Sequence, residues 1–121
     1  MRSILLIDDD ANIRMALREF LTEAGFVVHV AREGQHALHV LDKIDPPDLI
    51  LLDYKMPVMD GKQFLAMMRG NPRLQTIPVV IMSAATREWS GAHLEVEEVL
   101  SKPVDLAVLL DTVNRIFANR L

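Results

Sequence analysis

Five short apolar runs, separated by stretches with apolar residues at helical spacing, constrain the fold of this chain more than any other sequence feature. The runs span Ile4–Ile7, Phe26–Val30, Leu49–Leu52, Val79–Met82 and Val96–Leu100. Runs of this length predict strands, and the spacing between them predicts helices. Strands that alternate with helices indicate a parallel sheet, because parallel neighbours need crossover connections. We therefore expect one α/β domain, a doubly wound five-stranded parallel sheet with helices on both faces.

The composition of the strands predicts their order. Strands buried on both faces are apolar throughout, as the first, third and fourth runs are. The second run carries His29, and the fifth carries Glu97 and Glu98, so these two are expected at the edges. Right-handed crossovers then give the flavodoxin-like order 2-1-3-4-5. In this order the chain reverses direction between strands one and three, and ligands of such sheets bind there, beyond the carboxyl ends of the strands.

Polar side chains follow four of these strands. They are Asp8, Asp9 and Asp10 after the first, Asp53 at the end of the third, Ser83 at the end of the fourth and Lys102 after the fifth. Carboxylates gathered in one cleft repel one another unless a cation joins them. Mg²⁺, or Mn²⁺ in its place, suits a site with a few carboxylate oxygens. An ammonium and a hydroxyl beside it would neutralise the charge of a transferring phosphoryl group.

Each of these residues also has an ordinary structural interpretation. Asp10 and Ser83 are typical of helix N-caps, and Lys102 of a solvated loop. The functional hypothesis rests on the combination, because residues of the types that phosphoryl transfer needs stand at four separate strand ends.

Composition excludes several classes of function. The chain has no cysteine, so disulfides and thiolate metal sites are absent. Its formal net charge is −4 and its 13 Lys and Arg residues are scattered, which argues weakly against direct nucleic-acid binding. No apolar run approaches the roughly 20 residues of a membrane helix, and the first residues do not resemble a signal peptide. We expect a cytoplasmic protein without membrane contact.

Four segments carry a family resemblance: ILLIDDD, DLILLDYKMPVMDG, IPVVIMSA and LSKPV, in this order. With them the chain resembles a receiver domain of two-component response regulators, of the chemotaxis-regulator type, over residues 1–121. The resemblance implies that Asp53 takes a phosphoryl group from the phosphohistidine of a sensor histidine kinase or a histidine phosphotransfer protein. It also implies slow hydrolysis of the acyl phosphate, so that the domain is a switch for a homodimer or a downstream effector and not a metabolic enzyme.

The resemblance assigns further roles around Asp53. It implies that Asp9 and Asp53 bind Mg²⁺ directly with the backbone carbonyl of Lys55, while Asp8 acts through water. Ser83 would donate a hydrogen bond to the phosphoryl group, and Lys102 would pair with it. The remaining implied roles are room for the phosphoryl group at Ala84, a cis bond before Pro103, and the shape of the loop after Asp53 at Pro57 and Gly61.

Two departures from the family pattern concern the output of the switch. The family has Tyr or Phe three residues before the conserved lysine, where this chain has Val99. Only 18 residues separate Ser83 from Lys102, about one helical turn fewer than usual for the family. We expect a fourth helix of about two turns within residues 84–95, with Trp89 on it. We then expect activation of the domain to change how well ordered residues 84–95 are, more than it changes any side chain of the fifth strand.

Two other functions stay open at this point. A phosphatase of the haloacid-dehalogenase type would use Asp8 as nucleophile, and Asp8 with Asp10 has its Asp-x-Asp spacing. Against it, Asn12 stands where that motif has Thr. A degenerate receiver that serves only as a docking module is the second alternative, and it would not accept a phosphoryl group.

Overall fold

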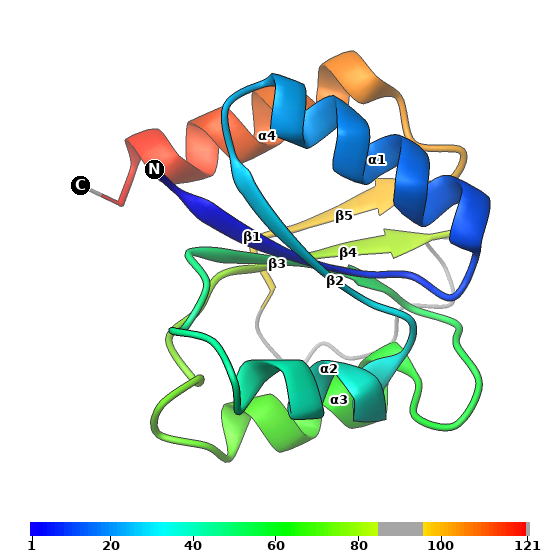
Figure 1. Cartoon of the computed structure of the whole chain (residues 1–121), viewed down its shortest axis with the longest axis vertical. Helices are drawn as coiled ribbons and strands as arrows, with labels where there is room; N and C mark the ends of the chain where they lie inside the picture. The colour runs from blue at the N-terminus through cyan, green and yellow to red at the C-terminus, as the bar shows by residue number, and fades with distance from the viewer. Residues whose placement is uncertain (85–95, 121) are drawn as a thin grey trace.

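The computed structural model describes residues 1–84 and 96–120, which form a five-stranded parallel sheet (Figure 1). The strands are β1 (Ser3–Ile7), β2 (Val27–Ala31), β3 (Leu49–Asp53), β4 (Val79–Ser83) and β5 (Glu98–Ser101). Their spatial order is β2-β1-β3-β4-β5, and every neighbouring pair is parallel. The predicted strand order is confirmed, with β2, which carries His29, and β5, which carries Glu98, at the edges.

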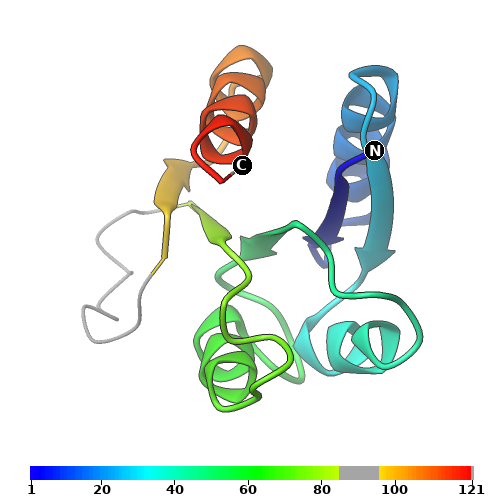
Figure 2. The same cartoon turned by 90° about the vertical axis from the view of Figure 1, so that its left-hand side faces the viewer.

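Helices cover both faces of this sheet, as predicted. The described helices are α1 (Ala11–Glu23), α2 (Gly34–Leu41), α3 (Gly61–Arg69) and α4 (Leu106–Ala118). Figures 1 and 2 show α1 and α4 on one face of the sheet and α2 and α3 on the other. The predicted short helix with Trp89 lies outside the described residues, so the structure does not test it. None of the helices in the described part of the chain has the length and apolar character that crossing a bilayer requires.

The sheet separates two hydrophobic clusters. Side chains of a strand alternate between the two faces, so Leu5 and Ile7 of β1 pack on the side of α2 and α3, while Ile4 and Leu6 pack on the side of α1 and α4. All four are fully buried, as are residues 49–52 of β3 and 79–82 of β4. This burial explains why the runs Ile4–Ile7, Leu49–Leu52 and Val79–Met82 of the central strands are apolar throughout.

The predicted strand ends are close to those observed, with one difference of two residues. The fifth strand was expected to start at Val96 and begins at Glu98. Val96 is apolar because it packs against the hydrophobic cluster on the α2 and α3 side, although it precedes the strand. The predicted strand was too long at its start because Val96 packs against the core without pairing in the sheet.

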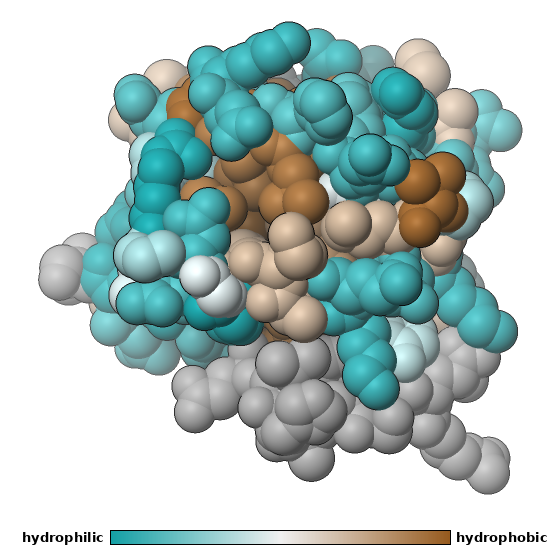
Figure 3. All heavy atoms as spheres, turned by 90° about the horizontal axis from the view of Figure 1, so that it is seen from below, coloured by the Kyte–Doolittle hydropathy of each residue, from teal (hydrophilic) through white to brown (hydrophobic). Residues whose placement is uncertain are grey.

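The outer face of α2 and α3 exposes some apolar surface. Figure 3 shows apolar side chains in the middle of this face, among hydrophilic ones. Met67 on α3 is 57% exposed, and the partly buried Val40 and Ile44 pack against the cluster beneath. Met67 is thus a large apolar residue that the described core does not use.

The loop between β3 and α3 is held closely on both sides. Gly61 donates to the carbonyl of Tyr54 at 2.8 Å, and a Cβ at Gly61 would lie 2.8 Å from the carbonyl oxygen of Asp53. Gly34 donates to the carbonyl of Met59 at 3.1 Å, and a Cβ there would overlap the Met59 side chain. These close approaches fix the path of the chain just after Asp53, as the resemblance implied for Gly61.

Val58 in this loop has a positive φ of 66° and is 75% exposed. A β-branched residue is strained in this left-handed conformation, which asparagine tolerates. We expect Val58→Asn to raise the free energy of unfolding by about 1 kcal/mol, measured by urea denaturation.

Val108→Asn is the matched control, since Val108 is half exposed on α4, where the backbone is helical. We expect the control to change the free energy of unfolding by less than about 0.5 kcal/mol. If both substitutions had the same effect, the strain at Val58 would be refuted.

Candidate functional site

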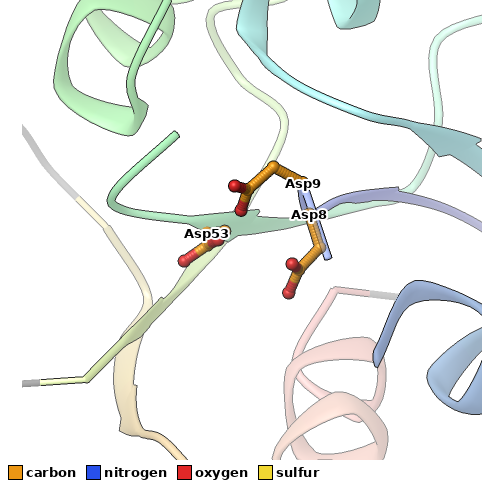
Figure 4. Close-up of side chains that lie close together, drawn as sticks. All are labelled: Asp8, Asp9 and Asp53. Carbon is orange, nitrogen blue, oxygen red and sulfur yellow. The ribbon is translucent and has the colours of Figure 1, made fainter. Parts of the chain in front are cut away.

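Three carboxylates meet at the carboxyl ends of β1 and β3. Each of Asp8, Asp9 and Asp53 offers an oxygen, and these oxygens lie within 4.8 Å of one another. Figure 4 shows Asp8 and Asp9, which follow β1, beside Asp53, which ends β3. Asp8 and Asp53 are buried and Asp9 is exposed, so the cluster opens to solvent on the side of Asp9. Three of the predicted site residues therefore come together.

Asp8 is fixed by contacts to each of its polar groups. Its Oδ1 accepts the backbone N–H of Asp10 at 2.9 Å, and its Oδ2 pairs with the ammonium of Lys102 at 3.2 Å. Its own N–H donates to the carbonyl of Ala31 at 3.2 Å, and its carbonyl accepts from Nη1 of Arg14 at 2.7 Å. The side chain is completely buried. Asp8 thus connects the end of β1 to β2, to α1 and to Lys102.

Lys102 joins the two buried carboxylates. Its Nζ lies 3.2 Å from Asp8 and 3.1 Å from Oδ1 of Asp53. Its backbone N–H donates to the carbonyl of Ser83 at 2.8 Å, which continues the pairing of β5 with β4. Burial lowers the pKa of the Lys102 ammonium, but the two carboxylates outweigh this effect and the net pKa is raised. The bond to Pro103 is cis, as predicted.

Asp53 is a buried carboxylate whose pKa is raised by its surroundings. Burial, followed by the negative charge of Asp8, raises the pKa of Asp53 from its ordinary value of 3.8 to about 7, although Lys102 opposes the shift. Asp53 is 4% exposed. One ammonium is therefore insufficient to neutralise the cluster, and a divalent cation beside these oxygens would favour the ionised form.

The other predicted residues take different places around the cluster. Ser83 ends β4 and is 1% exposed, at the end of the strand next to Asp53. Ala84 and the side chain of Lys55 are exposed. Asp10 is the N-cap of α1, where its Oδ1 accepts the N–H groups of Asn12 and Ile13 at 2.9 and 3.1 Å. The structural interpretation is therefore right for Asp10.

Arg14 is a residue of the site that sequence reasoning missed. It lies on α1, and its guanidinium reaches back to the carbonyl of Asp8. The available signal was its position, because a cation in the first turn of a helix opposes the helix dipole and needs another reason to be there.

An apolar groove adjoins the site between α1 and the loop after Lys102. It has a volume of about 310 Å³ and is lined by Ile13, Ala16, Leu17, Lys102, Pro103, Val104 and Leu106. Ile13 is 38% and Leu106 42% exposed. A partner that approaches Asp53 from this side would meet an apolar surface.

Comparisons with known proteins agree on one family. A family model described as "Response regulator receiver domain" matches residues 4–114. The transcriptional regulatory protein CpxR of Escherichia coli is 38% identical over 106 residues, which cover 85% of this chain and 44% of CpxR. An uncharacterized 14.6 kDa protein of Leptolyngbya boryana is 33% identical over 115 residues, which cover 93% of this chain and 87% of the relative. The chain thus spans most of one relative and under half of the other.

Solved structures give the same result. The chemotaxis response regulator CheY4 of Vibrio cholerae superimposes with a TM-score of 0.88 at 29% identity, covering 96% of this chain and 98% of that one. The response regulator TrrA of Thermotoga maritima, in complex with Mg²⁺ and BeF, superimposes with a TM-score of 0.85 at 26% identity, covering 96% and 99%.

The raised pKa of Asp53 predicts a pH-dependent stability. Between about pH 4 and pH 7 the unfolded chain has lost this proton while the folded chain keeps it, so this group makes the fold less stable as the pH rises through that window. We expect Asp53→Asn to be more stable than wild type by about 1–3 kcal/mol near pH 8, and by little near pH 4. Urea denaturation in metal-free buffer measures both. A difference that stays constant across this range would contradict the prediction.

Proposed function

We propose a phospho-acceptor function for this chain, which belongs to the response regulator receiver domain family of two-component signalling. The acceptor is Asp53, and residues 1–121 act as one receiver domain. The observation that carries the proposal is the burial of Asp53 at a strand end, with Asp8, Asp9 and the ammonium of Lys102 around it. A carboxylate with an opposing cation and further oxygen ligands is the arrangement that phosphoryl transfer to aspartate needs.

The oxygen donors of the cluster fit Mg²⁺, or Mn²⁺ in its place. Mg²⁺ takes oxygen ligands from one or two carboxylates and keeps several waters, and the exposed side of the cluster at Asp9 leaves room for them. In the proposal Asp9 and Asp53 bind the ion directly with the backbone carbonyl of Lys55, and Asp8 acts through water. When bound, the ion supplies positive charge against the phosphoryl oxygens. The similarity to TrrA, whose structure contains Mg²⁺ and BeF, supports this assignment.

The protein groups then have separate roles in the transfer. An ionised oxygen of Asp53 forms the new bond to phosphorus as the bond from phosphorus to the donor histidine nitrogen breaks, and the electron pair stays with that nitrogen. Lys102 pairs with the transferred group, the Ser83 hydroxyl donates a hydrogen bond to it, and Ala84 leaves it room. Slow attack of water on the acyl phosphate returns the domain to its initial state.

The two alternative functions fit the structure less well. Asp8, the nucleophile of a haloacid-dehalogenase-type phosphatase, is completely buried, with Oδ1 on the Asp10 N–H and Oδ2 on Lys102. Asp10, the second residue of that motif, accepts from the first turn of α1. A degenerate docking module would not require three carboxylates and an ammonium in one cleft.

We further propose that the donor is a sensor histidine kinase or a histidine phosphotransfer protein that shares the cytoplasm with this chain. Asp53 lies next to an apolar groove, and such a groove beside a reactive group suits a partner with an apolar helical surface. The phosphorylated domain would act on a second copy or a downstream effector. Val99 packs against the cluster on the α2 and α3 side and has no aromatic ring to move, so output takes a route other than rotation of a ring.

Phosphorylation of Asp53 can be tested with a small-molecule donor. With acetyl phosphate and Mg²⁺ we expect one acid-stable, base-labile phosphoryl adduct, located on Asp53 by mass spectrometry and lost in Asp53→Asn and in EDTA. Asp10→Asn is the matched control, because asparagine also caps a helix, and we expect it to keep the adduct. An adduct on Asp8 would support the phosphatase, and no adduct at all would support the docking module.

Partner docking at the apolar groove can be separated from the chemistry. Leu106→Glu places a charge in the groove at the first residue of α4, where an acidic residue is compatible with the helix. The donor is a phosphorylated histidine kinase, chosen from a panel of kinases for its fast phosphoryl transfer to the wild-type chain. We expect the rate of this transfer to fall about tenfold, with unchanged labelling by acetyl phosphate. Met67→Glu, on the outer face of α3, is the control and should leave both rates unchanged. Equal transfer rates in Leu106→Glu and Met67→Glu would exclude the groove.

A further inference from the structure

We propose that Arg14 is a positioning residue that holds the carboxylate cluster in the geometry that binds a divalent cation. The inference rests on the proposed function, because it assigns to the same cluster a residue outside the predicted set. Nη1 of Arg14 donates to the backbone carbonyl of Asp8 at 2.7 Å, and the side chain is half-buried. It is the hydrogen bond that ties this carbonyl to α1.

The carbonyl of Asp8 belongs to the peptide unit that joins Asp8 to Asp9. Peptide units are planar, so fixing this oxygen also fixes the backbone N–H of Asp9 and limits the directions in which its side chain can leave. The other groups of Asp8 are already held, by Asp10, Lys102 and Ala31. Asp9 is the exposed member of the cluster. Its carboxylate therefore depends on this peptide unit for its position more than the buried carboxylates do.

Helix stability does not explain an arginine at this position. Arg14 is the fourth residue of α1, and its N–H donates to the carbonyl of Asp10, the N-cap, at 2.9 Å. A cation in the first turn faces the positive end of the helix dipole and is unfavourable there. Asp10 already caps the helix. The helix itself therefore does not call for a guanidinium at this position, whereas the hydrogen bond to the carbonyl of Asp8 uses one.

Charge alone and positioning predict opposite effects on metal affinity. A positive charge near the cluster repels Mg²⁺, so its removal without any change in geometry should tighten binding. If Arg14 holds the peptide unit of Asp8 and Asp9, its removal should weaken binding although a repulsive charge has gone. Loss of a partner that orients metal ligands typically costs about 10–100-fold in affinity.

The experiment compares two arginines of the same helix. Arg14→Met and Arg18→Met each remove one positive charge from α1, but the side chain of Arg18 is exposed and makes no hydrogen bond or ion pair with the described residues. Titration with MgCl₂, followed by two-dimensional amide NMR, gives the dissociation constant and reports on the fold in the same spectra. We expect binding about tenfold weaker in Arg14→Met, and equal or tighter binding in Arg18→Met.

Each outcome bears on the inference. Equal or tighter Mg²⁺ binding by a folded Arg14→Met overturns it and leaves the phospho-acceptor proposal intact. Equal weakening in both variants also overturns it, because a general effect of the substitution on α1 would then suffice. If wild type itself binds no Mg²⁺, the metal part of the proposed function fails as well. If Arg14→Met does not fold, Arg14→Gln and Arg18→Gln, which keep a polar side chain, decide the question in the same titration.

Discussion

The repulsion between two buried carboxylates is the constraint on which the rest of this structure depends. Asp8 and Asp53 lie at the ends of adjacent strands, and the ammonium of Lys102 contacts both. Lys102 reaches them because β5 pairs with β4 and its N–H bonds to the carbonyl of Ser83. Lys102 can contact both carboxylates only because β1, β3 and β5 end at the same edge of the sheet. The charge balance is incomplete, since burial and the charge of Asp8 raise the pKa of Asp53 despite Lys102, and a cation beside these oxygens would favour the ionised carboxylate.

Much of the fold followed from the sequence because burial acts directly on strand composition. The edge strands were identified from His29 and Glu98, since a charged or histidine side chain is costly between two layers of helices. The convergence of Asp8, Asp9, Asp53 and Lys102 followed from topology, because parallel strands end at one edge. Details set by three-dimensional contacts did not follow. The strained backbone of Val58 is forced by the loop around it, and the role of Arg14 depends on a carbonyl whose direction the sequence does not contain.

The run of three aspartates shows why composition alone could not assign the site. Asp8 is buried and paired, Asp9 is exposed in the carboxylate cluster, and Asp10 caps a helix. Identical side chains take three environments because the backbone turns from strand to helix within three residues. The sequence predicted that these carboxylates lie at the switch point, but the turn decides which of them is buried, which is exposed and which caps the helix. Arg14 acts on the same turn from the helix that follows it.

The separation of the core into two clusters has a consequence for how such a domain can diversify. Ile4 and Leu6 pack in one cluster while Leu5 and Ile7 pack in the other, and the clustered carboxylates lie beyond both, at the rim of the sheet. Packing changes under α2 and α3 therefore need no compensating change under α1 and α4. Packing on one face of the sheet can therefore change while the contacts among the carboxylates at the rim stay the same. A fold divided in this way can keep one arrangement of charged side chains at the rim of its sheet beside two helical faces that pack independently.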